Sequence, residues 1–464
     1  MTEPLDAWIA REYRHAAAQM MRSISPLDVV KERAGFGQVI RPIRGAIVAS
    51  PVPASYDPDP DYFFHWYRDS AVVIDALRVL VEDSEADVLA GESLRRIALG
   101  HFADFVAFSL GLRDLDGRTL VAAPAWRGRV REDFQRFLRA DTDLAKAHGA
   151  AVAAETRVNA DGTLDVSSWP RPQHDGPALR ALAVMRWLRC ALARLEPAVE
   201  AAAVQLLRGD LAFTRARWRE PCFDIWEEEP GFHYYALCIA AAALEAGAAW
   251  HTARGAVGEA QACRADAASV RERLDGYWSA QSGFYCSRVL ASGERSAKAL
   301  DISVVLAAIH ADAPGSRHSV CDARVHSTLE RLEALFDAEY PINRDRPRTR
   351  APALGRYRGD AYYSGGPYYF STLGAAELCF RAAARAGTVA GTLIQRGDAY
   401  FETVRAYTPP SGDLSEQFDQ RSGEQTSAKH LAWSYAAFIT CAAARRVAVS
   451  RAQEARPIQS PRGG

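Results

Sequence analysis

Apolar residues recur every three or four positions through most of the chain, which is the spacing of one buried face of an α-helix. The alternation typical of strands is scarce, apart from pieces such as Phe284-Tyr285-Cys286. The chain is therefore predicted to be all-α. The apolar pattern predicts helices over residues 4–22, 69–82, 90–111, 177–195, 198–216, 231–252, 255–277, 300–311, 320–337, 367–387, 389–405 and 427–448.

Short and long connections alternate between these helices and so sort them into pairs. Connections within pairs are short, as at 195–197, 251–254 and 386–387. No internal repeat points to a regular solenoid. We therefore expect an (α/α)₆ barrel, a closed double ring of six helix pairs, with long loops at one rim, where functional residues are common. The long connections, polar and rich in Gly, Pro and aromatic residues, are 41–68, 113–176, 217–230, 278–299, 338–366 and 406–426.

Composition and charge narrow the function. Hydrophobic residues make up 48% of the 464 residues, and 56 basic residues nearly balance 57 acidic ones, so neither a nucleic acid nor a membrane is an expected partner. The first residues carry Asp, Glu and Arg where a secretion signal would be apolar, which predicts a cytoplasmic protein. We expect a single catalytic domain over 1–450 and a disordered tail over 451–464.

The cysteines do not suggest a metal site. Eight of them are scattered without CxxC or Cys/His ligand spacing. Several lie inside apolar helical runs, as Cys238 and Cys441 do, where a cysteine acts as a small buried hydrophobe. No metal is therefore expected.

An aromatic stretch, DYFFHWYRDS at 61–70, ends in an arginine and an aspartate. The C–H bonds of a pyranose stack on aromatic rings, while Arg68 and Asp69 are suited to hydrogen-bond its hydroxyls. The alternative is that Asp69 caps the next helix and the aromatic side chains fill the core. The composition of the loop leaves both interpretations open.

A second stretch, FDIWEEEPG at 223–231, places four carboxylates around Trp226 just before a predicted helix. One interpretation is that the glutamates complement the positive helix N-terminus, at about 0.3–1 kcal/mol each. A helix end, however, does not require Asp-Ile-Trp before the acids. A carboxyl group crowded by like charges beside an aromatic wall is also the setting of a glycosidase acid.

Further unusual loops precede other predicted helices. Each also has a plain structural interpretation, as a helix entry, a cap or a tight turn packed by aromatic residues. A P-loop, a dinucleotide fingerprint, HExxH and GxSxG are all missing from the sequence. These loops are SSWPRPQHDGPALRAL (167–182), GERSAKALDISVVLAAIH (293–310), GRYRGDAYYSGGPYYF (355–370) and SGDLSEQFDQRSGEQ (411–425).

Taken together and in this order, the loops resemble glucoamylase, family 15 of the glycoside hydrolases. The resemblance spans about residues 40–445, and the family's (α/α)₆ barrel agrees with the helix pairs predicted above. The motifs that carry it are DYFFHWYRDS (61–70), SWPRPQHDGPALRA (168–181), DIWEEEPG (224–231), GRYRGDAYYSGGPYYFSTLGAAE (355–377) and SEQFDQRSGEQTSAKHLAWSYAA (415–437).

The resemblance assigns roles motif by motif. Glu227 matches the family's general acid, and Glu416, in Ser-Glu-Gln, matches its general base. Arg68 and Asp69 match the pair that holds the glucose at the non-reducing end. In Arg295 and Asp301 the spacing is longer than in the family. The other residues that match substrate contacts, or their supports, are Tyr62, Trp66, Trp169, Asp224, Trp226, Glu228, Arg295 and Asp301.

The resemblance implies an inverting, exo-acting hydrolase that needs no cofactor. Its expected substrates are maltose and malto-oligosaccharides, from which it would release β-glucose. His174, where fungal members usually have arginine, and Glu229-Pro230 depart from the family and leave α-1,6 linkages of the isomaltose or dextran type, or trehalose, as alternatives. Phosphorolysis on a similar barrel is a rival reaction that Glu416 opposes. An inactive sugar-binding barrel is the non-enzymatic alternative. The oligomeric state is not indicated.

Overall fold

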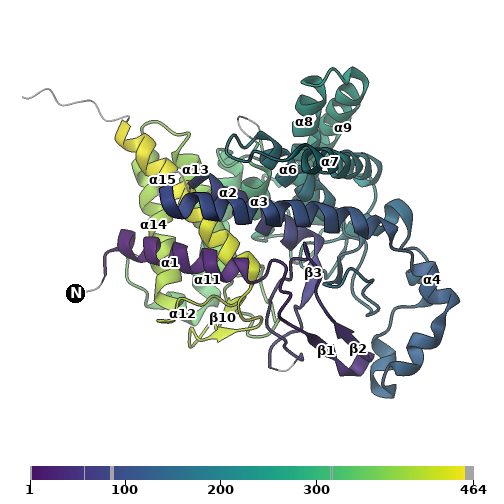
Figure 1. Cartoon of the computed structure of the whole chain (residues 1–464). Helices are drawn as coiled ribbons and strands as arrows, with labels where there is room; N and C mark the ends of the chain where they lie inside the picture. The colour runs from purple at the N-terminus through teal and green to yellow at the C-terminus, as the bar shows by residue number, and fades with distance from the viewer. Residues whose placement is uncertain (1–2, 57, 84–87, 314, 316, 455–464) are drawn as a thin grey trace, which may run out of the picture.

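Helices form the body of the molecule, as the apolar periodicity predicts (Figure 1). The computed structural model describes residues 3–56, 58–83, 88–313, 315 and 317–454. Each of the predicted helical ranges contains a helix, most with ends within a few residues of the prediction. The chain is thus all-α in its framework, with short strands confined to the connections.

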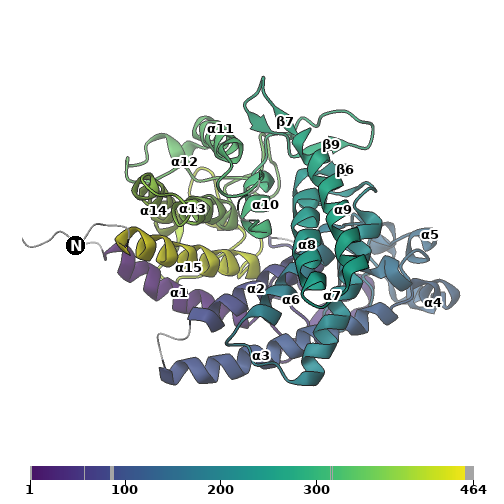
Figure 2. The same ribbon diagram turned by 90° about the horizontal axis from the view of Figure 1, so that it is seen from above.

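Six helices close into an inner ring. Each packs against the next, and the last packs against the first, so the ring has no open side. Viewed from above, these helices surround the centre of the molecule (Figure 2). In ring order they are α2 (Tyr67–Asp83), α6 (Asp175–Arg189), α8 (Tyr234–Thr252), α10 (Ser303–Ala311), α13 (Tyr369–Ala383) and α15 (Ala432–Glu454).

A second set of helices covers the outside of this ring. Each outer helix packs against the inner helix with which it shares a short connection, and α1 packs against α15, which joins the two ends of the chain. This arrangement confirms the expected (α/α)₆ double ring. The outer helices are α3 (Val88–Gly111), α7 (Pro197–Arg217), α9 (Val257–Asp275), α11 (Ala323–Glu339), α14 (Ala390–Tyr407) and α1 (Leu5–Met21).

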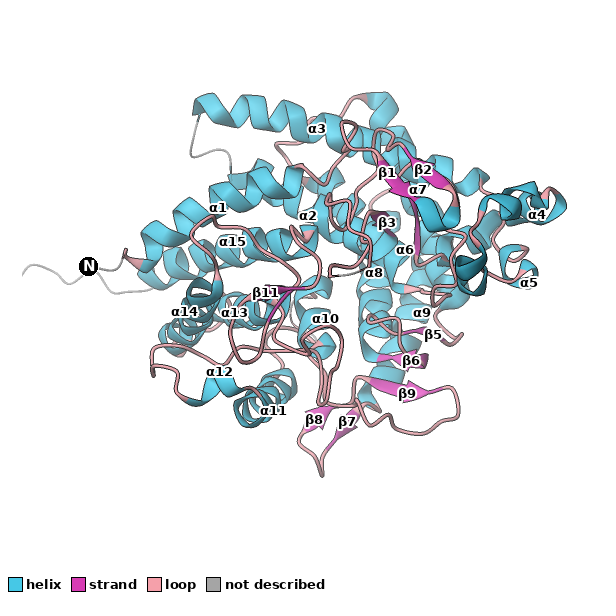
Figure 3. Ribbon diagram, turned by 90° about the horizontal axis from the view of Figure 1, so that it is seen from below, coloured by secondary structure: helices cyan, strands magenta, loops and turns pink. Residues whose placement is uncertain are grey.

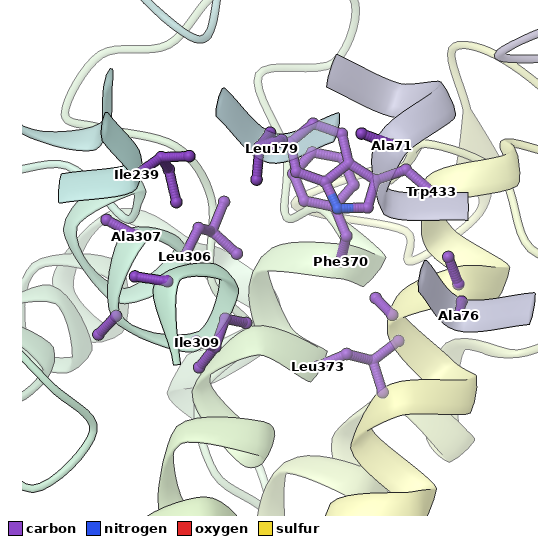
Figure 4. Packing of buried hydrophobic residues seen from close by; sticks show 14 of the residues in the cluster. Ala71, Ala76, Leu179, Ile239, Leu306, Ala307, Ile309, Phe370, Leu373 and Trp433 are labelled. Atoms are coloured by element: carbon purple, nitrogen blue, oxygen red, sulfur yellow. The ribbon is translucent and has the colours of Figure 1, made fainter. Parts of the chain in front are cut away.

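The main apolar core fills the middle of the inner ring, where side chains from all six inner helices meet (Figure 4). Phe370 and Trp433 stack in parallel with ring centroids 4.4 Å apart. Leu179, Ile239 and Leu306 approach them from three other helices and are buried. Burial of each such side chain stabilises the fold by about 1.5–3 kcal/mol, so this apolar core holds the inner helices in fixed positions relative to one another.

The loops before the inner helices gather on one side of the barrel (Figure 3). Inner helices all run in the same direction, since each is followed by an outer helix that returns the chain, so their N-terminal ends share one rim. Short antiparallel strands tie these loops together. They are β1 (Lys31–Arg33) with β2 (Gln38–Ile40), β3 (Phe64–Trp66) with β4 (Arg157–Asn159), β6 (Pro230–His233) between β5 (Cys222–Phe223) and β9 (Arg288–Leu290), β7 (Trp278–Ser279) with β8 (Phe284–Tyr285), and β10 (Gln417–Phe418) with β11 (Gln425–Thr426).

Some predicted boundaries were wrong. Residues 427–431 are not helical, because Ser427 and His430 adopt left-handed backbone conformations with φ of 63° and 50°. The loop over 113–176 contains short helices that the periodicity did not predict. These are α4 (Gly117–Ala122) and α5 (Asp141–Leu144). A further short helix, α12 (Pro341–Arg344), lies in another loop. Turns of 3₁₀ helix occur at Ala34–Phe36, Leu112–Asp114, Pro124–Arg129, Glu132–Phe137 and Gly149–Ala154.

The C-terminal helix α15 continues through Glu454, so residues 451–454 are helical and not part of a tail. The rest of the expected tail, 455–464, lies outside the described residues.

Seven of the eight cysteines are buried, in agreement with a packing role, and Cys321 is exposed. Within the described ranges, no helix is long and apolar enough to cross a membrane.

Candidate active site

The acidic turn before α8 holds Glu227 in a strained backbone conformation. Its φ is 62°, in the left-handed region that costs a residue with a side chain about 1–3 kcal/mol. Asp224 holds the turn in this shape: its carbonyl oxygen accepts from the Glu227 amide at 3.0 Å, and its Oδ1 accepts from the Glu228 amide at 2.7 Å. Asp224 is thereby buried and supports the turn, so it positions Glu227 without facing the rim.

Four donors from other rim loops contact the Glu227 carboxylate, one of them Gln173 Nε2 at 3.5 Å from Oε1. Arg68 Nη2 donates to Oε1 at 2.8 Å, and the indole of Trp66 donates to the same oxygen at 3.2 Å. The indole of Trp169 donates to Oε2 at 3.1 Å. The side chain of Glu227 keeps 11% exposure, so it is held by these contacts and still open toward the rim.

Glu416 lies in the loop before α15 and is buried to 8% exposure. Ser427 Oγ donates to its Oε2, and the Tyr62 hydroxyl lies 3.4 Å from its Oε1. Burial raises the pKa of Glu416 to about 7, while the Ser427 hydrogen bond and the Arg356 charge oppose a further rise. The carboxyl group can therefore exist in both protonation states near neutral pH.

An aromatic pair connects the two glutamates. Tyr62 lies against Glu416, Trp66 donates to Glu227, and the two rings are 5.2 Å apart between centroids. Trp169 meets Trp66 edge-on at 6.2 Å. The structure thus brings Glu227 and Glu416, from loops far apart in the sequence, to one aromatic wall.

Arg68 and Asp69 lie at the end of this wall at the start of α2. Arg68 Nη1 is 3.4 Å from Asp175 Oδ2, and its Nη2 is 3.5 Å from Asp69 Oδ2. Burial raises the pKa of Asp69 to about 6; Arg68 opposes the rise, and the nearby charges of Glu227 and Asp175 add to it. Within the described chain, Asp69 Oδ2 and Arg68 Nε are buried without a hydrogen-bond partner. Such groups are suited to bind the hydroxyls of a sugar.

Glu228 faces a different set of partners. Its carboxylate accepts from Lys298 Nζ at 2.6 Å, from the Tyr357 hydroxyl at 2.6 Å and from Arg356 Nη2 at 3.1 Å. The side chain is 25% exposed and Lys298 is 30% exposed. The Glu228 side chain is therefore more open to solvent than that of Glu227.

Asp301 and Arg295, which the resemblance assigns to substrate binding, take other places. Asp301 is fully buried, where it accepts from the Trp226 indole at 2.8 Å and pairs with Arg288. Through this hydrogen bond Asp301 holds the Trp226 indole in place from the buried side. Arg295 is exposed and its Nη1 lies 3.4 Å from Ser279 Oγ, on the hairpin β7–β8. The structure does not bring Arg295 to the wall that holds the glutamates.

Arg288 is the centre of the support behind the acidic turn. It pairs with Asp224 and with Asp301, and both carboxylates are buried. We expect Arg288→Met to lower the free energy of unfolding by about 3–5 kcal/mol, because it leaves two buried charges without their partner. Urea unfolding followed by circular dichroism measures this.

Arg295→Met is the matched control, because it makes the same change in the same segment at an exposed position. It should alter the free energy of unfolding by no more than about 0.5 kcal/mol. Equal losses in the two variants would contradict the central place of Arg288.

Several residues of the site were not found from the sequence. Gln173 accepts from Arg68 Nη1 at 3.2 Å and donates to the Asp224 carbonyl at 2.7 Å, joining two rim loops. Its position in SWPRPQHD was a usable signal. Lys298 is one of only four lysines, which marks it as unusual in this composition. Ser427 and Tyr357 carry no such signal, since their roles arise from long-range contacts.

Among the residues that the structure describes, no three His, Cys, Asp or Glu side chains group in a way that could hold a metal ion. The arginines and indoles around the glutamates are donors and not metal ligands. What the site offers is two carboxyl groups, aromatic surface and hydrogen-bonding groups.

Comparisons with known proteins agree with this description. The model of Glycosyl hydrolases family 15 matches residues 33–109, 152–395 and 387–443. The chain is 27% identical to a glucoamylase of Neurospora crassa, over 86% of this chain and 63% of that protein. It is 26% identical to a probable glucoamylase of Schizosaccharomyces pombe, over 94% of this chain and 90% of that protein.

Solved structures extend the comparison to the fold. The chain superposes on a glucoamylase from Saccharomycopsis fibuligera with a TM-score of 0.75, over 96% of both chains at 18% identity. At that identity the likeness shows the fold alone. The chain spans 63% of the Neurospora crassa relative, whose length exceeds that of the matched region. Since the family model covers most of the residues, including both candidate glutamates, the chain belongs to family 15 of the glycosyl hydrolases.

Proposed function

We propose that this protein hydrolyses α-linked gluco-oligosaccharides from their non-reducing ends and releases β-D-glucose, with α-1,4 linkages as its main substrates. The observation that carries the proposal is the position of Glu227 and Glu416 on one aromatic wall, beside the buried pair Arg68 and Asp69. The relatives named as glucoamylases support the same reaction.

The proposed chemistry needs an acid and a base on opposite sides of one carbon. Glu227 in its protonated form donates a proton to the glycosidic oxygen as the C1–O bond breaks. Glu416 in its ionised form takes a proton from a water that attacks C1 from the other face. Inversion requires room for this water, so the two carboxyl groups should be about 6.5–9.5 Å apart in the enzyme with substrate bound.

Arg68 and Asp69 support action on a chain end. A guanidinium and a carboxylate that are buried together form hydrogen bonds to hydroxyls of one terminal sugar and close the site behind it. Tyr62, Trp66 and Trp169 supply the surface on which that sugar stacks. A glucan that continued past this pair would meet the start of α2.

The configuration of the product tests the proposal directly. Maltotriose is a suitable substrate, because its first cleavage gives one glucose from the non-reducing end and maltose. Proton NMR of the early reaction, recorded before mutarotation, should show β-glucose appearing first. α-Glucose as the first product would rule out the proposed mechanism. A panel of maltose, maltotriose, isomaltose and trehalose, assayed for free glucose, identifies the linkage; fastest release from isomaltose or trehalose would replace the α-1,4 assignment.

The pKa of Glu416 predicts how the rate depends on pH. A base must be ionised, and burial raises the pKa of Glu416 to about 7, so kcat/KM should fall as the pH falls through this value. Ser427→Ala removes a hydrogen bond that favours the ionised form, which raises this pKa further. A bond to a charged group is worth about 1.5–3 kcal/mol, and one pKa unit corresponds to about 1.36 kcal/mol, so we expect the acidic limb to move up by about one to two pH units.

The measurement is kcat/KM for maltose over a range of pH in Ser427→Ala and in the control Ser422→Ala. Ser422 is exposed in the same loop, and its hydroxyl contacts the Glu424 amide and not Glu416. The control should keep the parent profile. If the acidic limb of the profile does not move in Ser427→Ala, the titration of Glu416 does not set that limb, and Glu416 is not the base.

A further inference from the structure

A second cavity lies outside the inner ring, away from the two glutamates. It has a volume of about 740 Å³, within the range of pockets that hold small organic ligands. Its walls come from the C-terminal end of α3, the 3₁₀ turn Gly149–Ala154, α6 and α7, which pack against one another around it. Figure 2 shows α3 passing α6 and α7 on this side of the barrel.

The polar groups of the cavity include buried donors that the protein leaves unused. Arg180, 3% exposed, gives Nε and Nη2 to Asp210 at 2.8 and 2.7 Å. Within the described residues its Nη1 has no hydrogen-bond partner, and neither has Ser109 Oγ, although Ser109 is 1% exposed. Both residues line the cavity. A buried arginine N–H without an acceptor is costly, so the site favours a ligand that supplies one.

The charged side chains that line the cavity carry a net charge of +1, from three arginines and two carboxylates. Arg180 is paired with Asp210, and Arg217 with Glu220 at 2.7 Å. Arg113 gives Nη2 to the Leu206 carbonyl at 3.1 Å, and no carboxylate of the described residues lies within 4 Å of it. A single anionic group would therefore balance the cavity.

The position of Arg113 depends on a glycine. A Cβ at Gly209 would come within 2.1 Å of Arg113 Nη2, so a larger residue at this position would displace the guanidinium from its place against α7. Both residues line the cavity. The absence of a side chain at 209 thus places the unpaired charge at the cavity wall.

The remaining walls are mostly apolar. Phe213, Leu112 and Val152 line the cavity together with several alanines. A sugar phosphate would leave many hydroxyls without partners against such walls. An anion with an apolar body fits both the single excess charge and the lining.

We propose that this cavity binds a small organic monocarboxylate with an apolar body, its carboxylate held by Arg113 and Arg180 and its body lying against Phe213. The proposal is independent of the reaction at Glu227 and Glu416. It concerns binding alone and involves no covalent step.

Isothermal titration calorimetry of the full chain tests the site with benzoate and octanoate as probes. We expect binding of one molecule per chain, with benzyl alcohol, octanol and inorganic phosphate at least tenfold weaker. An alcohol that binds as tightly as its carboxylate would overturn the proposal, because the charge would then not be recognised. Phosphate that binds as tightly as benzoate would overturn it too, since the apolar body would then contribute nothing.

Two variants locate the binding. Arg113→Met removes the unpaired charge, and Ala212→Trp places a bulky side chain in the cavity from an exposed position on α7. Each should weaken carboxylate binding at least tenfold. Ala201→Trp, at an exposed position of the same helix that is not part of the cavity, is the control and should leave binding unchanged.

Circular dichroism confirms that each variant is folded before it is titrated. Binding that is unchanged in both Arg113→Met and Ala212→Trp would place the ligand elsewhere and overturn the assignment. Loss of binding in the control as well would do the same, because the effect would then not depend on the cavity.

Discussion

Glu227→Gln is expected to lower kcat on maltose by at least about 10²–10⁴-fold, the usual contribution of a well-placed proton donor. The amide oxygen of glutamine can still accept from Arg68 and Trp66, as Oε1 does, whereas the amide nitrogen that replaces Oε2 cannot accept from the Trp169 indole. The side chain keeps its shape, so the turn should remain folded. What it loses is the proton that the leaving oxygen needs. Steady-state kinetics on maltose measures the loss.

An activated substrate separates this role from a general loss of activity. Fluoride leaves without a proton, so α-glucosyl fluoride should be hydrolysed by Glu227→Gln far better than maltose is. Glu229→Gln is the matched control: it makes the same change in the same turn, at a side chain that contacts Arg288 and Ser296. Near-normal turnover of maltose by Glu227→Gln, or an equal loss in Glu229→Gln, would reject Glu227 as the acid.

The framework of the fold could be predicted because it depends on local periodicity. An inner helix such as α8 is apolar on nearly all sides, since it is covered by its neighbours in the ring and by its outer partner. The alternation of short and long connections then fixed which helices pair. Closure of the ring was expected from this pairing, and the contact of α15 with α2 confirms it.

The ends of helices at the rim could not be predicted in the same way. Residues 230–233 continue the apolar pattern of α8, but Gly231 and His233 pair as a strand with Leu290 and Arg288, which are distant in the sequence. At 427–431 the chain bends so that Ser427 can reach Glu416, and the helix starts only at Ala432. In both places long-range contacts override local preference.

The site shows the same division. The family resemblance pointed to Glu227 and Glu416, and the structure brings the two to one wall. Sequence spacing could not show whether Asp301 faces the rim or the interior. In the structure its carboxylate is fully buried and accepts from the Trp226 indole. The roles of Asp301 and Asp224 in holding the turn follow from their pairing with Arg288.

The effect of Glu416→Ala distinguishes a base from a structural carboxylate. We expect kcat on maltose to fall by at least about 10²–10⁴-fold, since the attacking water then keeps both protons as it approaches C1. Hydrolysis of α-glucosyl fluoride by Glu416→Ala should fall as well, in contrast to its hydrolysis by Glu227→Gln, because the attacking water must be activated whatever the leaving group is. Glu424→Gln, an exposed change in the same loop, should keep the parent rate.

Chemical rescue provides the stricter test of Glu416. Azide is already anionic and needs no base, and alanine leaves room for it beside Tyr62 and Ser427, the residues that contact the Glu416 carboxylate. With α-glucosyl fluoride, Glu416→Ala in azide should therefore form β-glucosyl azide, the product of attack from the face opposite the leaving group. Formation of the α-azide would mean attack from the same face as departure, and it would place the base, and with it the inverting mechanism, elsewhere than at Glu416.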